Sequence, residues 1–549
     1  MRAKKPFVFL CVMTAALWGA AFATGAGRPE TTVREGGLAG VSADGLAIFK
    51  GVPYAAPPTG ERRWKPPAPP APWTGMRDAS EFGPSCVQPK PNPDSLYADE
   101  PAAKSEDCLT LNVWAPEKAK SAPVVVWVHG GSLLYGGSAS PFCDGANIAR
   151  RGVVLVSINY RLGVLGWMAH PELSTESPDG VSGNYGLLDQ IAALEWVRDN
   201  IAVFGGDPDN VTVMGESAGA LSVSYLLTSP LARGLFHKAI AQSANIRAVP
   251  ALKRSVYGLP SAEDIGAAVA ASAGAADLNA LRAMDAHALT ATAVKARFAP
   301  QGTIDGRALP QQVVDVFDAR RQARVPLLAG FNSGEIRSQR VFVPPAPASA
   351  AAYEAEIEKR YGDLALAFLR LYPASDIPGS MLATLRDAIY GWASERMVRG
   401  QSEAGPNAYL YYFDHCYEEA AMRDLCAFHA SDVPYVFGQV GADAALLANW
   451  PRPEGEGERV LSDTMMDYWV SFAKTGVPSS PNGPEWKPYS AGEAFMRFSG
   501  EAIAETDLLP GMFELQEELV RRRRCAGQQW FINVGVIATP VEACEEDRK

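Results

Sequence analysis

The stretch from Val211 to Leu227 constrains the fold more than any other part of the chain. The short apolar run Val211–Met214 leads into the sequence GESAG at residues 215–219, and Ala218–Leu227 has helical composition. A strand, a sharp turn and a helix thus follow directly on one another. Glycines on both sides of Ser217 allow the backbone to pass through a tight turn that exposes the hydroxyl group. Such a unit predicts a parallel sheet covered by helices.

Other apolar runs support this sheet. Val124–Val128 and Val153–Ile158 are continuous and rich in β-branched residues, as strands buried on both faces are. From Leu187 to Ile201, apolar residues recur at spacings of 4, 3, 3 and 4, which predicts a crossover helix. The sequence therefore predicts an α/β fold with a central, mostly parallel twisted sheet flanked by helices.

The rest of the chain favours one domain with insertions. Large α/β proteins often fold as one body, so we expect residues 24–549 to form a single domain. Alanine-rich segments of helical character occupy residues 251–323 and 346–399, and we expect these insertions to roof the sheet. The tail, residues 521–549, has two cysteines of its own and predicts a disulfide-held cap or a tether for a partner.

The N-terminus predicts export. Three basic residues within the first five precede the apolar stretch Phe7–Phe22, and residues 21–23 have the small-x-small form of a cleavage site. We expect a signal peptide at residues 1–23, a secreted or periplasmic mature chain, and no stable membrane span after its removal. A membrane anchor is the rival interpretation, but the stretch is short for a bilayer.

Export would allow the seven cysteines beyond Cys11 to form disulfides. Sequence alone does not fix their connectivity, and buried free thiols are the alternative. Spacing favours the pairs Cys86 with Cys108, Cys416 with Cys426, and Cys525 with Cys544, which leaves Cys143 unpaired.

Charge argues against binding to nucleic acids. The formal net charge is -11, and no aromatic residues interleave with the basic run Arg521–Arg524. We expect this run to be a solvated helix face.

A glycine turn follows the strand Val124–Val128. Its sequence, HGGS at residues 129–132, can aim consecutive backbone amides at one point, as the oxyanion of a tetrahedral intermediate requires. We expect Gly131, Ser132 and Ala218 to supply these donors. His129 ends a buried strand and precedes Ser217, so we interpret it as structural.

A serine nucleophile in this setting is followed in chain order by an acid and then by a histidine. Of the six histidines, His415 and His429 fit that order. His429 lies in a loop of small residues, whereas His415 ends the aromatic strand Tyr409–Phe413, so we expect His429 to be the base.

The strand Val325–Ala329 runs into a loop that contains Glu335. Functional groups gather at this end of parallel sheets, so we expect Glu335 to orient the histidine. Asp432 is the weaker candidate for this acid, because it is too close to His429 in the sequence for its carboxylate to reach the imidazole easily. A solvated loop position is the default alternative for Glu335.

Several further segments resemble the type-B carboxylesterase family, which includes the cholinesterases. They cover most of the mature chain: FKGVPYA at residues 49–55, EDCLTLNV at 106–113, NYRLG at 159–163, FGGDP at 204–208 and WVSFA at 469–473. The resemblance implies the α/β-hydrolase fold, a secreted bacterial-type member, and an acyl-enzyme mechanism without cofactor or metal. It also implies a gorge roofed by insertions, with Glu335 in place of an aspartate, and it supports the pair Cys86 and Cys108.

The chain departs from the family pattern in two places. Ser132 stands where the family usually has a third glycine, which leaves the amide donor available but narrows the room near the acyl group. Gly334 and Ile336 flank Glu335, where the family often has aspartate before the glutamate and glycine after it.

Hydrolysis of a small-molecule carboxylic ester is the function that these residues predict. A non-catalytic adhesion protein on the same fold is the alternative from another class, and a thioesterase, amidase or lactonase could use the same residues. Arg337 and Arg340 follow the acid and could favour an anionic substrate, although solvated loop arginines are commoner. The sequence predicts neither the substrate nor the oligomeric state.

Overall fold

The computed structural model describes residues 28–544, so the predicted signal peptide lies outside the described part. Its large sheet consists of β3 (Val41–Ala43), β4 (Leu46–Pro53), β8 (Thr110–Pro116), β9 (Ala122–Val128), β10 (Val154–Ile158), β11 (Gly206–Glu216), β12 (Lys238–Gln242), β13 (Leu327–Asn332), β14 (Ala408–Phe413), β15 (Ala494–Phe498) and β16 (Ala502–Thr506).

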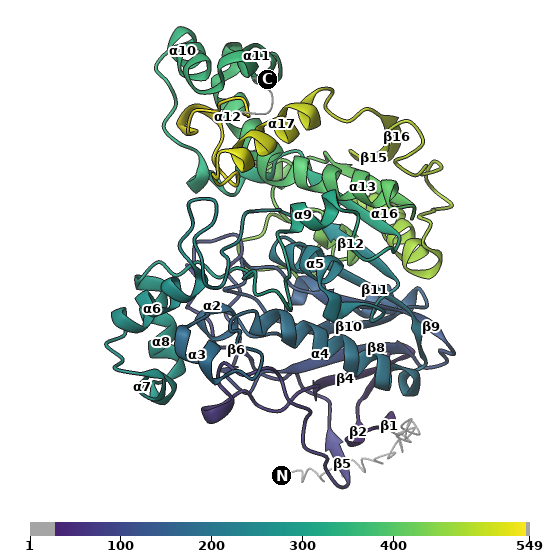
Figure 1. Ribbon diagram of the computed structural model, residues 1–549. Coiled ribbons are helices and arrows are strands. Elements are labelled where there is room, and N and C mark those ends of the chain that lie inside the picture. Colours follow the sequence, from purple (N-terminus) through teal and green to yellow (C-terminus); the bar gives the residue numbers. More distant parts are fainter. Residues whose placement is uncertain (1–27, 545–549) are drawn as a thin grey trace, which may run out of the picture.

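These eleven strands lie in the order β16-β15-β14-β13-β12-β11-β9-β10-β8-β4-β3 (Figure 1). All neighbours from β15 to β10 in this order are parallel, and the strands at both edges are antiparallel. Parallel neighbours need crossover connections, which the helices supply. The predicted mostly parallel sheet flanked by helices is confirmed.

Both faces of the sheet are buried, which explains the continuous apolar runs. Along β9, Val124, Val126 and Val128 face one hydrophobic core, whereas Val125 and Trp127 face the other. This alternation is the two-residue period of a strand.

The helices contribute to these two cores from opposite sides. The first core includes residues of α4 (Tyr185–Asn200), α5 (Ala218–Thr228), α9 (Val313–Asp318) and α13 (Trp392–Glu403). The second includes residues of α1 (Ala146–Arg150), α15 (Val433–Val436) and α16 (Glu456–Thr475). The predicted crossover helix corresponds to α4.

Two further groups of helices lie outside these layers (Figure 1). The group α6 (Ala262–Ser272), α7 (Leu278–Ala283) and α8 (Ala286–Lys295) shares a hydrophobic cluster with α2 (Gly163–Trp167) and α3 (Pro171–Glu176). The group α10 (Ala350–Tyr361), α11 (Ala365–Leu371) and α12 (Ile377–Arg386) shares another with α17 (Met512–Cys525) and the C-terminal tail.

The interpretation of Arg521–Arg524 as a solvated helix face is wrong for its middle residues. Arg522 and Arg523 are only 6% and 1% exposed. Arg522 pairs with Asp363 at 2.7 Å, and Arg523 donates to the carbonyl oxygen of Thr539 at 3.2 Å. Because α17 is packed among the α10–α12 helices and the tail, its charged side chains find partners inside the protein.

The structure contains all three of the disulfides favoured by spacing. They are Cys86–Cys108, Cys416–Cys426 and Cys525–Cys544, and Cys143 is buried and free. Within residues 28–544, no helix combines the length and the apolar character needed to cross a membrane.

Candidate active site

Ser217 occupies a strained turn between β11 and α5. Its φ of 55° and ψ of -118° lie in a region that side chains rarely adopt. The turn brings α5 so close to β9 that a Cβ atom added to Gly219 would lie 2.0 Å from the carbonyl oxygen of Val128. The amide of Ser217 donates to the carbonyl oxygen of Gln242 at 2.9 Å, which fixes the turn to the end of β12.

His429 lies on the loop after β14, and its Nε2 atom is 2.8 Å from the hydroxyl oxygen of Ser217. Two tyrosines hold this loop. The hydroxyl of Tyr97 donates to the carbonyl oxygen of His429 at 2.9 Å, and the ring of Tyr390 lies 4.9 Å from the imidazole. The disulfide Cys416–Cys426 closes the same loop.

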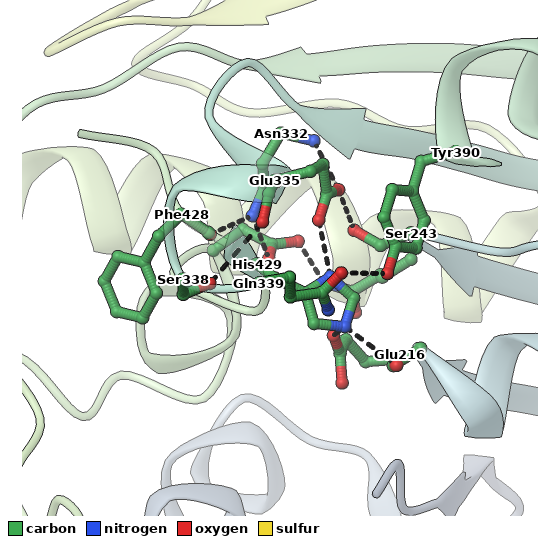
Figure 2. A network of polar contacts seen from close by, with 12 residues as sticks. Glu216, Ser243, Asn332, Glu335, Ser338, Gln339, Tyr390, Phe428 and His429 are labelled. Atoms are coloured by element: carbon green, nitrogen blue, oxygen red, sulfur yellow. Dashed lines mark hydrogen bonds and ion pairs between the residues drawn. The ribbon is translucent and has the colours of Figure 1, made fainter. Parts of the chain in front are cut away.

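Glu335 follows β13 and is completely buried. Its Oε2 atom lies 2.5 Å from Nδ1 of His429. The other carboxylate oxygen accepts hydrogen bonds from the amide of Asn332 at 2.9 Å and from the hydroxyl of Ser243 at 2.6 Å. Figure 2 shows Glu335 aimed at the imidazole from the side opposite Glu216. Three donors, Nδ1 of His429 among them, therefore fix the position of this carboxylate.

The loops that carry Glu335 and His429 are joined to each other. The amide of Gly334 donates to the carbonyl oxygen of Ala427 at 3.0 Å, and the side chain of Asn332 donates to that of Phe428 at 2.9 Å. Only glycine fits at position 334, because a Cβ atom there would lie 1.9 Å from the carbonyl oxygen of Cys426. The distance between acid and histidine is thus fixed by the backbone.

Glu216 is a second carboxylate beside the imidazole. It is buried, and its Oε1 atom lies 3.2 Å from Nε2 of His429. This oxygen has no hydrogen-bond partner within the described chain. Burial raises the pKa of Glu216 to about 8, although the positive charge of a protonated His429 opposes this rise.

The charges around His429 favour its protonated form. Burial alone would lower the pKa of His429, but the negative charges of Glu216 and Glu335 outweigh this effect and raise it to about 9. A protonated imidazole is therefore stabilised in this setting, as it must be when a histidine accepts a proton from a serine.

The rival residues have other partners. The carboxylate of Asp432 accepts hydrogen bonds from Gln242, Asn332 and Tyr411, at 2.7, 3.1 and 2.8 Å. His415 lies 2.7 Å from Glu458. His129 is stacked on Tyr160 with ring centroids 4.5 Å apart, and burial lowers its pKa to about 4. A neutral, packed His129 fits the structural role expected of it.

The glycine turn after β9 leaves amides unused. Gly131 and Ser132 both have positive φ angles, of 96° and 59°. The amides of Gly131, Ser132 and Ala218 find no acceptor among residues 28–544. Free amides beside the serine are what a developing oxyanion needs.

The structure brings Ser217, His429 and Glu335 together, and it adds residues that the sequence did not predict. Ser243 could have been found because it directly follows a buried strand of the sheet. Tyr97 and Tyr390 carry no such signal, since tertiary contacts alone bring them to His429. Among the described residues, no cluster of three or more histidine, cysteine or acidic side chains could hold a metal ion.

Comparison with known proteins identifies the family of this chain. A sequence profile of the carboxylesterase family matches residues 28–508. The chain is 37% identical to fumonisin B1 esterase of Sphingopyxis macrogoltabida over 484 residues, which cover 85% of this chain and 86% of that protein. It is 34% identical to para-nitrobenzyl esterase of Bacillus subtilis (strain 168) over 472 residues, covering 83% and 92% of the two chains.

A solved structure of a PNB esterase superimposes with a TM-score of 0.76 at 32% sequence identity, and the match covers 89% of this chain and 99% of that one. Because the match covers most of this chain, it extends well beyond the motif around Ser217. The chain belongs to the carboxylesterase family and is a carboxylic ester hydrolase with the α/β-hydrolase fold.

Proposed function

We propose that Ser217, His429 and Glu335 form the catalytic triad of this esterase. The observation that carries the proposal is the continuous chain of short contacts from Ser217 to Glu335, with distances of 2.8 Å at Nε2 and 2.5 Å at Nδ1 of His429. Each residue comes from a different loop at the carboxyl ends of parallel strands, where α/β proteins gather reacting groups.

In the first half of the reaction, the hydroxyl oxygen of Ser217 attacks the ester carbonyl carbon while its proton passes to Nε2 of His429. The carbonyl oxygen becomes an oxyanion, and the amides of Gly131, Ser132 and Ala218 donate hydrogen bonds to it. When the intermediate collapses, the bond to the alcohol oxygen breaks and His429 returns its proton to that oxygen. The acyl group stays on Ser217.

In the second half, water attacks the acyl-enzyme and loses a proton to Nε2 of His429. Collapse of the second oxyanion returns this proton to Ser217 and releases the carboxylic acid. Glu335 keeps Nδ1 protonated and stabilises the imidazolium without accepting its proton. The reaction therefore uses only side chains, backbone amides and water.

The wider setting is also a proposal. We infer that residues 1–23 are a signal peptide and that the mature chain is a single secreted or periplasmic domain. Its three disulfides support this, because such bonds persist in oxidising compartments. We further propose that the insertions at about residues 251–323 and 346–399 roof the site, and that small-molecule esters rather than nucleic acids are its partners.

The test is hydrolysis of a neutral chromogenic ester, 4-nitrophenyl butanoate, by wild type and Ser217→Ala. We expect the variant to lose turnover by a factor on the order of a million, because the nucleophile is removed. Ser229→Ala is the matched control, since this buried hydroxyl has no hydrogen-bond partner in the described chain. Turnover by Ser217→Ala close to that of wild type would contradict the proposal, and a wild type inactive on esters, thioesters, amides and lactones would favour a binding protein.

A further inference from the structure

Arg247 is a cation near the catalytic residues that lacks an anionic partner. It lies on the segment that follows β12, a few residues beyond Ser243, the donor to Glu335. Its Nε atom donates to the side-chain oxygen of Asn245 at 3.1 Å. No other hydrogen bond and no ion pair involves its guanidinium group among residues 28–544, and the side chain is only partly buried. Its two terminal nitrogens are thus free to donate.

Other arginines near the site are already neutralised. Arg337 and Arg340, the two that the sequence indicated for an anionic substrate, both pair with Asp424. Arg386 pairs with Asp387 at 2.6 Å. Because a carboxylate of the protein occupies each of these three, an incoming anion would have to compete with it. Arg247 presents no such competitor.

Arg247 is held in place by the C-terminal tail. Its guanidinium carbon lies 4.7 Å from the centre of the Phe531 ring, a cation–π contact. The neighbouring Trp530 is 3% exposed and donates from its indole nitrogen to the carbonyl oxygen of Ile246 at 2.9 Å. The Cys525–Cys544 disulfide closes this part of the tail. These contacts orient the guanidinium and reduce the freedom that it would lose on binding an anion.

Tyr390 packs against the catalytic histidine and interacts electrostatically with Arg247. The ring centroids of Tyr390 and His429 are 4.9 Å apart. Burial lowers the pKa of Arg247, and electrostatic interactions with Tyr225 and Tyr390 oppose this effect, whereas no carboxylate does. The guanidinium lies partly buried beside the aromatic ring of Phe531, where its charge interacts more strongly with an opposite one than it would in bulk water.

The charges around Ser217 make such a cation useful. Glu216, Glu335 and Asp432 are all buried there. A substrate that carries a negative charge would be repelled by these carboxylates unless a cation lay beside its path. A planar guanidinium with free terminal nitrogens matches a carboxylate through two parallel hydrogen bonds.

We propose that Arg247 is a specificity-determining residue that binds a free carboxylate on the substrate, so that this enzyme prefers esters bearing such a group. The inference rests on the proposed ester hydrolysis at Ser217. It assigns to the tail beyond residue 508, where the family match ends, the task of positioning Arg247 through Phe531 and Trp530.

The test compares esters that differ only in a negative charge. The 4-nitrophenyl monoesters of adipic, pimelic and suberic acid carry the carboxylate on the acyl side, and the acetate of 4-hydroxybenzoic acid carries it on the alcohol side. The methyl ester of each compound is its neutral counterpart. We would measure kcat/KM of all pairs for wild type, Arg247→Met, Arg247→Lys and the control Arg337→Met.

On at least one pair, we expect Arg247→Met to lose about 10- to 100-fold in kcat/KM for the charged ester and less than about 3-fold for its neutral counterpart. Arg247→Lys should retain part of the preference, because it keeps the charge but not the paired donors. Arg337→Met should treat both members of each pair alike. Adipate should inhibit the wild type competitively at lower concentration than dimethyl adipate, a comparison that needs no variant.

Equal losses on charged and neutral esters in Arg247→Met, or no preference of the wild type on any pair, would overturn the inference. In either case, turnover of the neutral esters by wild type would leave ester hydrolysis at Ser217 intact. Failure of the wild type on every neutral and charged ester would instead count against the proposed function.

Discussion

Two glutamates contact the same imidazole from opposite sides, and their surroundings differ. Glu335, after β13, lies 2.5 Å from Nδ1 of His429 and accepts two further hydrogen bonds, from Asn332 and Ser243. Glu216, the last residue of β11, lies 3.2 Å from Nε2, and its nearer oxygen has no hydrogen-bond partner in the described chain.

The difference shows how one residue type can serve two purposes. Donors stabilise a carboxylate in its charged form, whereas burial without donors favours the neutral acid. Glu216, whose pKa burial raises to about 8, lies near the same Nε2 atom that contacts the hydroxyl of Ser217. The loop pair around Glu335 thus fixes geometry, and the turn around Glu216 tunes protonation.

The largest effect should come from Glu335→Gln. The amide preserves the shape but removes the charge that stabilises the imidazolium, and it can hold the wrong tautomer of His429. We expect kcat on a neutral ester to fall by about 10⁴-fold. Glu395→Gln is the matched control, since Glu395 is a buried carboxylate bonded to Tyr489 outside the site. A loss below tenfold would show that Glu335 does not orient the histidine.

Ser243→Ala should lower kcat by less, because it removes only one of the three donors to Glu335. A hydrogen bond to a charged group contributes about 1.5–3 kcal/mol. Because the two remaining donors still hold Glu335, we expect about a tenfold loss in kcat. Ser222→Ala, which removes a buried hydroxyl bonded to Gln190, should leave kcat unchanged. Equal behaviour of the two variants would mean that the contact with Ser243 does not support catalysis.

Removal of the disulfide that closes the His429 loop should act mainly on stability. In Cys416→Ser with Cys426→Ser, the chain-entropy estimate for this short loop is a loss of about 3 kcal/mol in the free energy of unfolding. We expect kcat to fall only a few-fold, because the bonds from Gly334 and Asn332 remain. Denaturant unfolding would measure the free energy of unfolding, and steady-state kinetics would measure kcat. The double variant Cys525→Ser with Cys544→Ser is the comparison. Unchanged stability would contradict the expectation.

Glu216→Gln should have the smallest effect at the pH optimum but should shift the pH profile. Its negative charge raises the pKa of His429, so its removal lowers that pKa. Because the base must be neutral to accept a proton, the acid limb of kcat/KM should move to lower pH, by about one unit. A limb that stays in place or moves to higher pH would show that Glu216 does not influence His429.

The sequence predicted the parts of this site that local pattern encodes. The strand, turn and helix around Ser217 and the chain order of acid and histidine both follow from short motifs, and the structure places these residues together. The apolar run Val211–Met214 underestimates the length of β11. This strand begins at Gly206, ahead of that run, because Gly206 pairs with Ala122 on the neighbouring strand. Boundaries of this kind depend on neighbouring strands rather than on composition.

Residues that only tertiary contacts bring to the site could not be predicted from local pattern. Tyr97 and Tyr390 reach His429 from segments far away in the sequence, and Arg247 gains its importance from the absence of a carboxylate around it. The same limit explains the error at Arg522 and Arg523, where a charge run predicts a solvated face only if nothing packs against the helix.

The most direct test of the Ser217 nucleophile is covalent labelling of the folded enzyme with an organophosphonate that reacts with activated serines. Intact-mass measurement and peptide mapping would follow the adduct in wild type and in Ser217→Ala. We expect one adduct per chain, on Ser217, and none in the variant. An adduct on another residue, undiminished labelling of Ser217→Ala, or no labelling of folded wild type would contradict this expectation.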